Sequence, residues 1–115
     1  MTVTLIEFDK PNRNGRTYLK HEITDLPKIV PCSMNHADNA FNLPGINSED
    51  TIGSADITMN EVGIYADVKP YKAKQEVFDN LMMDGYKIVS AGFGGLNENS
   101  EVIDFRLQYV FLTKE

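Results

Sequence analysis

The alternation of apolar and polar residues near the C-terminus constrains the fold of this chain more than any other feature. Between Val102 and Leu112 every odd-numbered position is apolar or aromatic: Ile103, Phe105, Leu107, Tyr109 and Phe111. The even-numbered positions include Asp104, Arg106 and Gln108. A period of two is typical of a strand that buries one face. The sequence therefore predicts a long C-terminal strand.

A second alternating segment predicts a β-hairpin. Thr51–Thr58 and Val62–Lys69 are two strand-like segments joined by the short connection Met59–Glu61. The second segment alternates Val62, Ile64, Ala66 and Val68 with Gly63, Tyr65, Asp67 and Lys69. One face of this hairpin should be buried.

Further elements follow from composition and from turn-forming residues. We expect strands at Thr2–Phe8, at Lys28–Met34 and at Tyr86–Phe93, and one or two helical turns within Leu19–Leu26. Pro31 should place its strand at an edge or a bulge, because proline has no amide proton to donate. Apolar residues at helical spacing predict one main helix over about residues 72–84, with Gly85 as its C-terminal cap.

These elements predict an α+β fold dominated by strands. The most economical arrangement is a small, partly closed antiparallel barrel or sheet with one main helix. A chain of 115 residues suits a single domain spanning residues 1–115.

Composition excludes several classes of function. The single Cys32 rules out an internal disulfide and suggests no metal site, and we expect neither metal nor cofactor. A net charge of −6 argues against nucleic-acid binding. The N-terminus has no secretory pattern, and no apolar run is long enough to span a membrane, so we expect no membrane partner.

Two segments contain residues suited to nucleophilic catalysis. Ser90 stands at the end of an apolar run that leads into a glycine-rich stretch, and His36 stands in a polar loop after a predicted strand. A serine hydroxyl becomes a nucleophile when a base such as histidine accepts its proton. Each residue also has an ordinary structural reading, Ser90 as the end of a strand and His36 as a hydrogen-bonded loop residue.

Other residues could complete such a site. Asp104 or Gln108 could orient the imidazole, and Gly92 and Arg106 could stabilise a developing oxyanion. Equally, Asp104 and Arg106 lie two positions apart on one strand face and could pair with each other on the sheet surface. The sequence alone leaves both readings open.

Four segments, in order along the chain, resemble the tailed-phage prohead (capsid maturation) proteases, which share a fold with the herpesvirus assembly protease. They are an Asn-x-Asn-Gly-Arg-x-Tyr segment at Pro11–Tyr18, a histidine segment at Pro31–His36, a hairpin at Ile52–Val68, and a Gly-x-x-x-x-Ser-x-Gly-Phe segment within Met83–Phe93. Gln108 departs from the pattern, since that position is commonly glutamate in the family.

The resemblance implies a serine endopeptidase with Ser90 as nucleophile and His36 as general base. Such a protein cleaves scaffold and capsid protein during procapsid maturation, inside the procapsid or virion head in the host cytoplasm. Its partners would be the major capsid protein and the scaffold protein of the same phage, and it would be a homo-oligomer or capsid-bound. The alternative is a catalytically idle protein of the same fold that serves as an auxiliary or decoration protein of the capsid.

Overall fold

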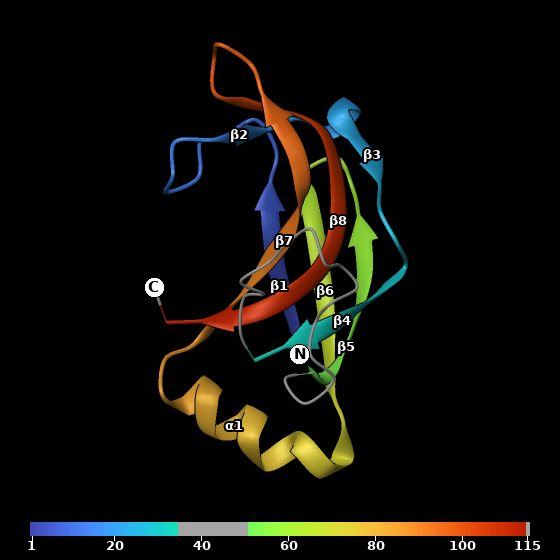
Figure 1. Cartoon of the computed structure of the whole chain (residues 1–115), viewed down its shortest axis with the longest axis vertical. Helices are drawn as coiled ribbons and strands as arrows, with labels where there is room; N and C mark the ends of the chain where they lie inside the picture. The colour runs from blue at the N-terminus through green and yellow to red at the C-terminus, as the bar shows by residue number, and fades with distance from the viewer. Residues whose placement is uncertain (35–50, 115) are drawn as a thin grey trace.

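The computed structural model describes residues 1–34 and 51–114, which form a sheet curled into a nearly closed barrel (Figure 1). The strands are β1 (Thr2–Glu7), β2 (Thr17–Tyr18), β3 (Ile23–Asp25), β4 (Ile29–Ser33), β5 (Thr51–Met59), β6 (Gly63–Pro70), β7 (Lys87–Leu96) and β8 (Glu101–Thr113). Within these described residues the helical segments are the 3-10 turns η1 (Lys20–Glu22) and η3 (Lys72–Lys74) and the helix α1 (Gln75–Met83). This architecture confirms the predicted strand-dominated α+β fold.

Strand β8 organises the sheet, because it pairs with more neighbours than any other described strand. The main path of the sheet runs β1-β6-β5-β4-β8-β2, and β3 and β7 also pair with β8. The β7–β8 and β5–β6 pairs are antiparallel hairpins, whereas β2, β3 and β4 all run parallel to β8. The sheet is therefore mixed rather than purely antiparallel.

Two β-bulges interrupt the alternation that was predicted for β8. The register with β7 shifts between Ala91 and Gly92 and again between Phe93 and Gly95. Each bulge adds a residue to β8 and so changes which face its side chains occupy. As a result Phe105, Leu107 and Tyr109 are buried as expected, but the buried set also includes even-numbered residues: Val102, Val110 and Leu112.

The hairpin of β5 and β6 forms as predicted. Ile64, Ala66 and Val68 are buried, and the pairing runs from Gly53 opposite Pro70 to Met59 opposite Ile64. The Asn60 side chain fixes the turn, since its Oδ1 accepts hydrogen bonds from the backbone amides of the two residues that end it, at 2.8 and 3.1 Å. Val62 departs from the expected pattern because it belongs to the turn and is exposed, and Gly63, expected on the opposite face, is buried as well.

The segment Leu19–Leu26 contains one helical turn, the lower of the two numbers predicted, followed by a strand that was not predicted. It contains the single 3-10 turn η1, after which Ile23–Asp25 forms β3 beside β8. The Thr24 hydroxyl lies within hydrogen-bond distance of two acceptors on β8, Oδ1 of Asp104 at 2.7 Å and the carbonyl oxygen of Phe105 at 3.1 Å, which share its single proton and fasten this short strand to its neighbour. A contact between residues so far apart in sequence overrides the local helical preference.

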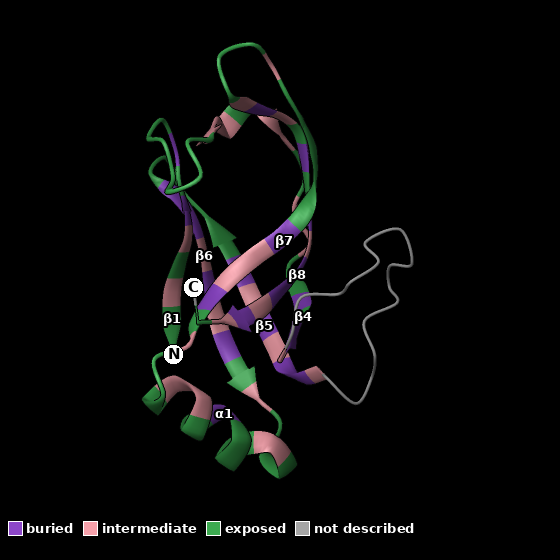
Figure 2. Cartoon of the chain, turned by 60° about the vertical axis from the view of Figure 1, so that its left-hand side comes forward, coloured by how far each residue is buried: buried purple, intermediate pink, exposed green. Residues whose placement is uncertain are grey.

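Helix α1 contributes one residue to the core. Phe78 is the only buried residue of α1 and belongs to the hydrophobic core, while most of the helix faces outward (Figure 2).

Pro31 lies in β4 just before the ladder to β8, which begins at Cys32. At the proline, β4 therefore has β5 as its only described neighbour. The expectation of an edge strand is wrong, because β4 lies between β5 and β8 in the sheet; the proline is instead accommodated before the ladder to β8 begins, next to an irregularity in the β4–β5 pairing after Cys32.

Candidate functional site

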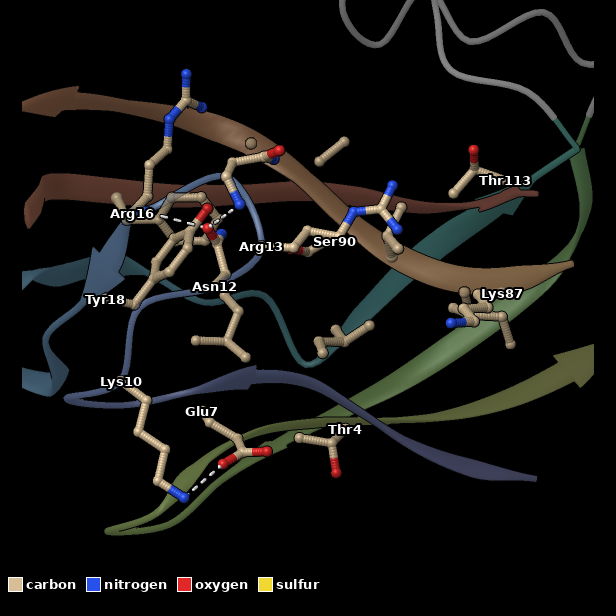
Figure 3. A pocket seen from close by; sticks show the side chains of 18 of the residues that line it. Thr4, Glu7, Lys10, Asn12, Arg13, Arg16, Tyr18, Lys87, Ser90 and Thr113 are labelled. Atoms are coloured by element: carbon tan, nitrogen blue, oxygen red, sulfur yellow. Dashed lines mark hydrogen bonds and ion pairs between the residues drawn. The ribbon is translucent and has the colours of Figure 1, made fainter. Parts of the chain in front are cut away.

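A cleft of about 940 Å³ lies along the seam where the barrel fails to close. One wall is formed by residues 4–7 of β1 and the other by residues 87–92 of β7. The loop that contains Asn12, Arg13 and Arg16 lies at one end, and Lys87 and Thr113 lie toward the other (Figure 3). Its volume is near the upper end of the range typical of ligand pockets.

Ser90 lies in the wall that β7 contributes, between the two ends of the cleft (Figure 3). It pairs with Val110 in the β7–β8 ladder, and both Val110 and Ile88, two residues before Ser90, belong to the hydrophobic core. Because directly opposed residues and residues two apart share a face, the Ser90 side chain lies on the inner face of the sheet. It is partly exposed, at the edge where this face opens into the cleft.

Gly92 also lines the cleft, and the structure gives it a packing role. A Cβ atom at this position would lie 2.2 Å from the carbonyl oxygen of Arg106 and 2.9 Å from the Phe105 ring. Only glycine permits such a close approach of two strands. Its predicted role in an oxyanion site stays a prediction.

His36 falls outside the described residues, but the strand that leads to it is described. Strand β4 ends at Ser33, and in the sheet Cys32 pairs with Val110, which in turn pairs with Ser90. Strand β8 therefore lies between β4 and β7, the strand that carries Ser90, and two strand spacings amount to roughly 10 Å. The chain that continues to His36 leaves the sheet two strands away from the serine.

Asp104 and Arg106 lie on the exposed part of β8 and do not line the cleft. The Asp104 carboxylate accepts a hydrogen bond from the Thr24 hydroxyl at 2.7 Å and from Nη2 of Arg106 at 3.3 Å. The Thr24 hydrogen bond, followed by the Arg106 charge, lowers the pKa of Asp104. Of the two readings that the sequence left open, the pairing on the sheet surface is thus present.

Gln108, the other candidate for orienting the imidazole, occupies the β8 bulge opposite Ala91 and Gly92. It is partly exposed and does not line the cleft. Among the described residues, the cleft thus brings together Ser90 and Gly92 from the predicted site, but not Asp104, Arg106 or Gln108.

Basic side chains surround the cleft, a feature that the sequence reasoning missed. Lys10, Arg13, Arg16 and Lys87 line it, against the single acidic residue Glu7, although the whole chain carries a net charge of −6. The sequence shows the cluster around Arg13 and Arg16 but gives no sign that Lys87 joins it, because only the closure of the barrel brings the two segments together.

The Lys10–Arg16 loop is held in place by the Asn12 side chain. Oδ1 of Asn12 accepts hydrogen bonds from the amides of Asn14 and Arg16, at 2.9 and 3.0 Å, and Gly15 adopts a φ of 76°. A positive φ is readily adopted by glycine, so the turn suits the Asn-Gly pair. The Arg16 side chain is consequently presented from an ordered turn rather than from a loose loop.

Tyr18 lines this end of the cleft. Its ring packs edge-on against Phe105, with centroids 5.1 Å apart. Burial raises the pKa of Tyr18, and the nearby Arg16 charge partly opposes that shift. The phenol is therefore neutral at physiological pH and contributes packing and a polar tip rather than charge.

Neither a metal site nor a membrane-spanning helix is found within residues 1–34 and 51–114. No group of three histidine, cysteine, aspartate or glutamate side chains gathers there, and no described helix is long and apolar enough to cross a bilayer. Comparisons with protein-family models, with curated proteins and with solved structures found no match to this chain.

Proposed function

We propose that this chain is a phage head-assembly protein of the prohead-protease kind, a serine endopeptidase with Ser90 as nucleophile and His36 as general base. The observation that carries the proposal is the position of Ser90, inside a cleft bounded by two strand edges. A peptide in extended conformation could lie along this cleft with its backbone beside the serine. The four sequence segments that resemble the prohead proteases add independent support.

In the proposed reaction, Oγ of Ser90 attacks the carbonyl carbon of the scissile peptide bond while His36 accepts the hydroxyl proton. His36 then donates that proton to the leaving amine as the C–N bond breaks, which leaves an acyl-serine. Water, deprotonated by the same imidazole, hydrolyses the ester and regenerates Ser90. The approach of β4 to within two strands of Ser90 is compatible with this role for His36.

A second candidate function is that of an auxiliary or decoration protein of the phage capsid. The observation in its favour is that Asp104, Arg106 and Gln108 are not among the residues that line the cleft beside Ser90. A protein with this cleft could bind an extended segment of the capsid protein without cutting it. Under this hypothesis the intact polypeptide is present in mature particles at a copy number commensurate with capsid symmetry.

Co-expression with the major capsid and scaffold proteins of the same phage separates the two candidates. The peptidase hypothesis predicts cleaved products that Ser90→Ala abolishes and that Ser54→Ala retains, since Ser54 lies on β5 and does not line the cleft. Cleavage that persists in Ser90→Ala would remove Ser90 from the mechanism. Uncut partners together with intact protein in purified particles would favour the auxiliary role instead.

A further inference from the structure

We infer that the cleft between β1 and β7 binds an acidic peptide segment in extended conformation, which pairs with the open edge of β7. This inference deepens the proposed function, because the bound segment would be the substrate or partner of the same cleft. It nevertheless concerns binding alone and does not depend on catalysis.

The first argument comes from the sheet topology. Among the described strands, β1 pairs only with β6 and β7 pairs only with β8, so the two strands that border the cleft each have one unpaired edge. An unpaired edge presents amide and carbonyl groups that can hydrogen-bond to an added strand. Addition of an extended peptide to such an edge is a recurrent mode of peptide recognition.

The second argument comes from charge. The basic side chain of Arg16 lies at one end of the cleft and that of Lys87 toward the other, while the Arg13 side chain extends from its loop toward the middle of the view, where Ser90 is labelled (Figure 3). Lys10 forms an ion pair with Glu7 at 3.1 Å, so the only acidic residue that lines the cleft is already paired. A concentration of positive charge on a chain with a net charge of −6 favours an occupant with negative charge.

The third argument comes from length. The β7 wall spans residues 87–92, which at about 3.3 Å per residue accommodates a segment of roughly six extended residues. Such a segment would pass Ser90 near its middle, with basic residues toward both of its ends. Acidic residues that flank the centre of the segment on both sides would therefore match the charges of the cleft.

Binding of synthetic peptides to the Ser90→Ala protein tests this inference. The probe is a fluorescent decapeptide in which glutamate alternates with valine, measured by fluorescence anisotropy at low ionic strength. One comparison peptide replaces glutamate with lysine, and another keeps the glutamates but replaces alternate valines with proline. The inference predicts that the first peptide binds at least about tenfold more tightly than either comparison peptide, since each exposed ion pair contributes about two- to fivefold and proline removes backbone donors.

A matched pair of protein variants locates the binding site. Arg16→Gln combined with Lys87→Gln should weaken binding of the glutamate peptide about fivefold or more. Lys28→Gln combined with Lys72→Gln changes the net charge equally, at exposed positions outside the cleft, and should leave binding unchanged. Hydrogen exchange should show that amides of β7 become protected when the peptide is bound.

Two results would overturn the inference, and neither coincides with failure of the proposed function. Equal affinity for the glutamate and lysine peptides would refute selection by charge, and equal affinity for the proline peptide would refute strand addition. If the glutamate peptide binds as predicted but the unmodified protein cuts no partner, the peptidase proposal fails and the binding inference stands. If Ser90 is required for cleavage but the peptides bind without preference, the binding inference fails and the peptidase proposal stands.

Discussion

Gly92 lies against Arg106 so closely that a Cβ atom on the glycine would come within 2.2 Å of the arginine carbonyl oxygen. This approach occurs between the two bulges of β8, where the strand turns its side chains from one face to the other. The glycine thus permits the irregular pairing of β7 and β8 right beside Ser90. The shape of the cleft wall depends on this contact.

Replacement of Gly92 with alanine should destabilise the protein by about 1–3 kcal/mol, because the added methyl group meets backbone rather than a movable side chain. Urea denaturation followed by circular dichroism measures the effect. Gly95→Ala is the matched control, since the nearest atom there is Cγ1 of the Ile103 side chain at 3.2 Å, and its effect should stay within about 0.5 kcal/mol. Equal stabilities for the two variants would contradict this account of the strand contact.

The thiol of Cys32 should be inert in the folded protein. Its exposed fraction is 0%, and burial raises its pKa to about 12, so almost no thiolate exists near neutral pH. Labelling with a disulfide reagent at pH 8 should be at least about a hundredfold slower in the native protein than in urea. Rapid labelling under native conditions would show that β4 is not packed as described.

Thr24 should control the ionisation of Asp104. The pKa of Asp104 is lowered in the folded state, so this carboxylate stabilises the fold above its unfolded pKa of about 3.9 and loses that contribution as the pH falls through the folded value. Thr24→Val removes the hydroxyl donor and should raise the pKa of Asp104, as followed by NMR titration of its carboxyl carbon. Thr58→Val is the control, since Thr58 is an exposed residue of β5 away from Asp104, and it should leave the Asp104 titration unchanged.

Much of the fold could be predicted from the sequence because its signals are local. The period of two in Gly63–Pro70 and the helical spacing of Gln75–Met83 depend only on neighbouring residues, and both elements form where expected. The bulges of β8 could not be predicted, since they depend on how β7 and β8 fit together; Asp104, at a φ of 52°, lies at one of them. Strand β3 was missed for the same reason, because its partner lies far along the chain.

The candidate site was predicted only in part. Ser90 was identified from its own neighbourhood of small residues, and the structure places it in a cleft. Asp104 and Arg106 carry chemistry suited to a site, but a bulge and the Thr24 contact hold them on the outer surface of β8. The basic cleft lining was missed because Arg16 and Lys87 line the same cleft only when the barrel curls, which no local pattern reveals.

Reaction with a fluorophosphonate probe tests most directly whether Ser90 is an activated nucleophile in an open cleft. Attack of the Ser90 oxygen on phosphorus with loss of fluoride would add the phosphonyl group to one residue, which peptide mass spectrometry identifies. We predict modification of Ser90, no modification of Ser54, and loss of the reaction in His36→Ala. An unmodified Ser90, or a rate of modification unaffected by His36→Ala, would contradict the central claim.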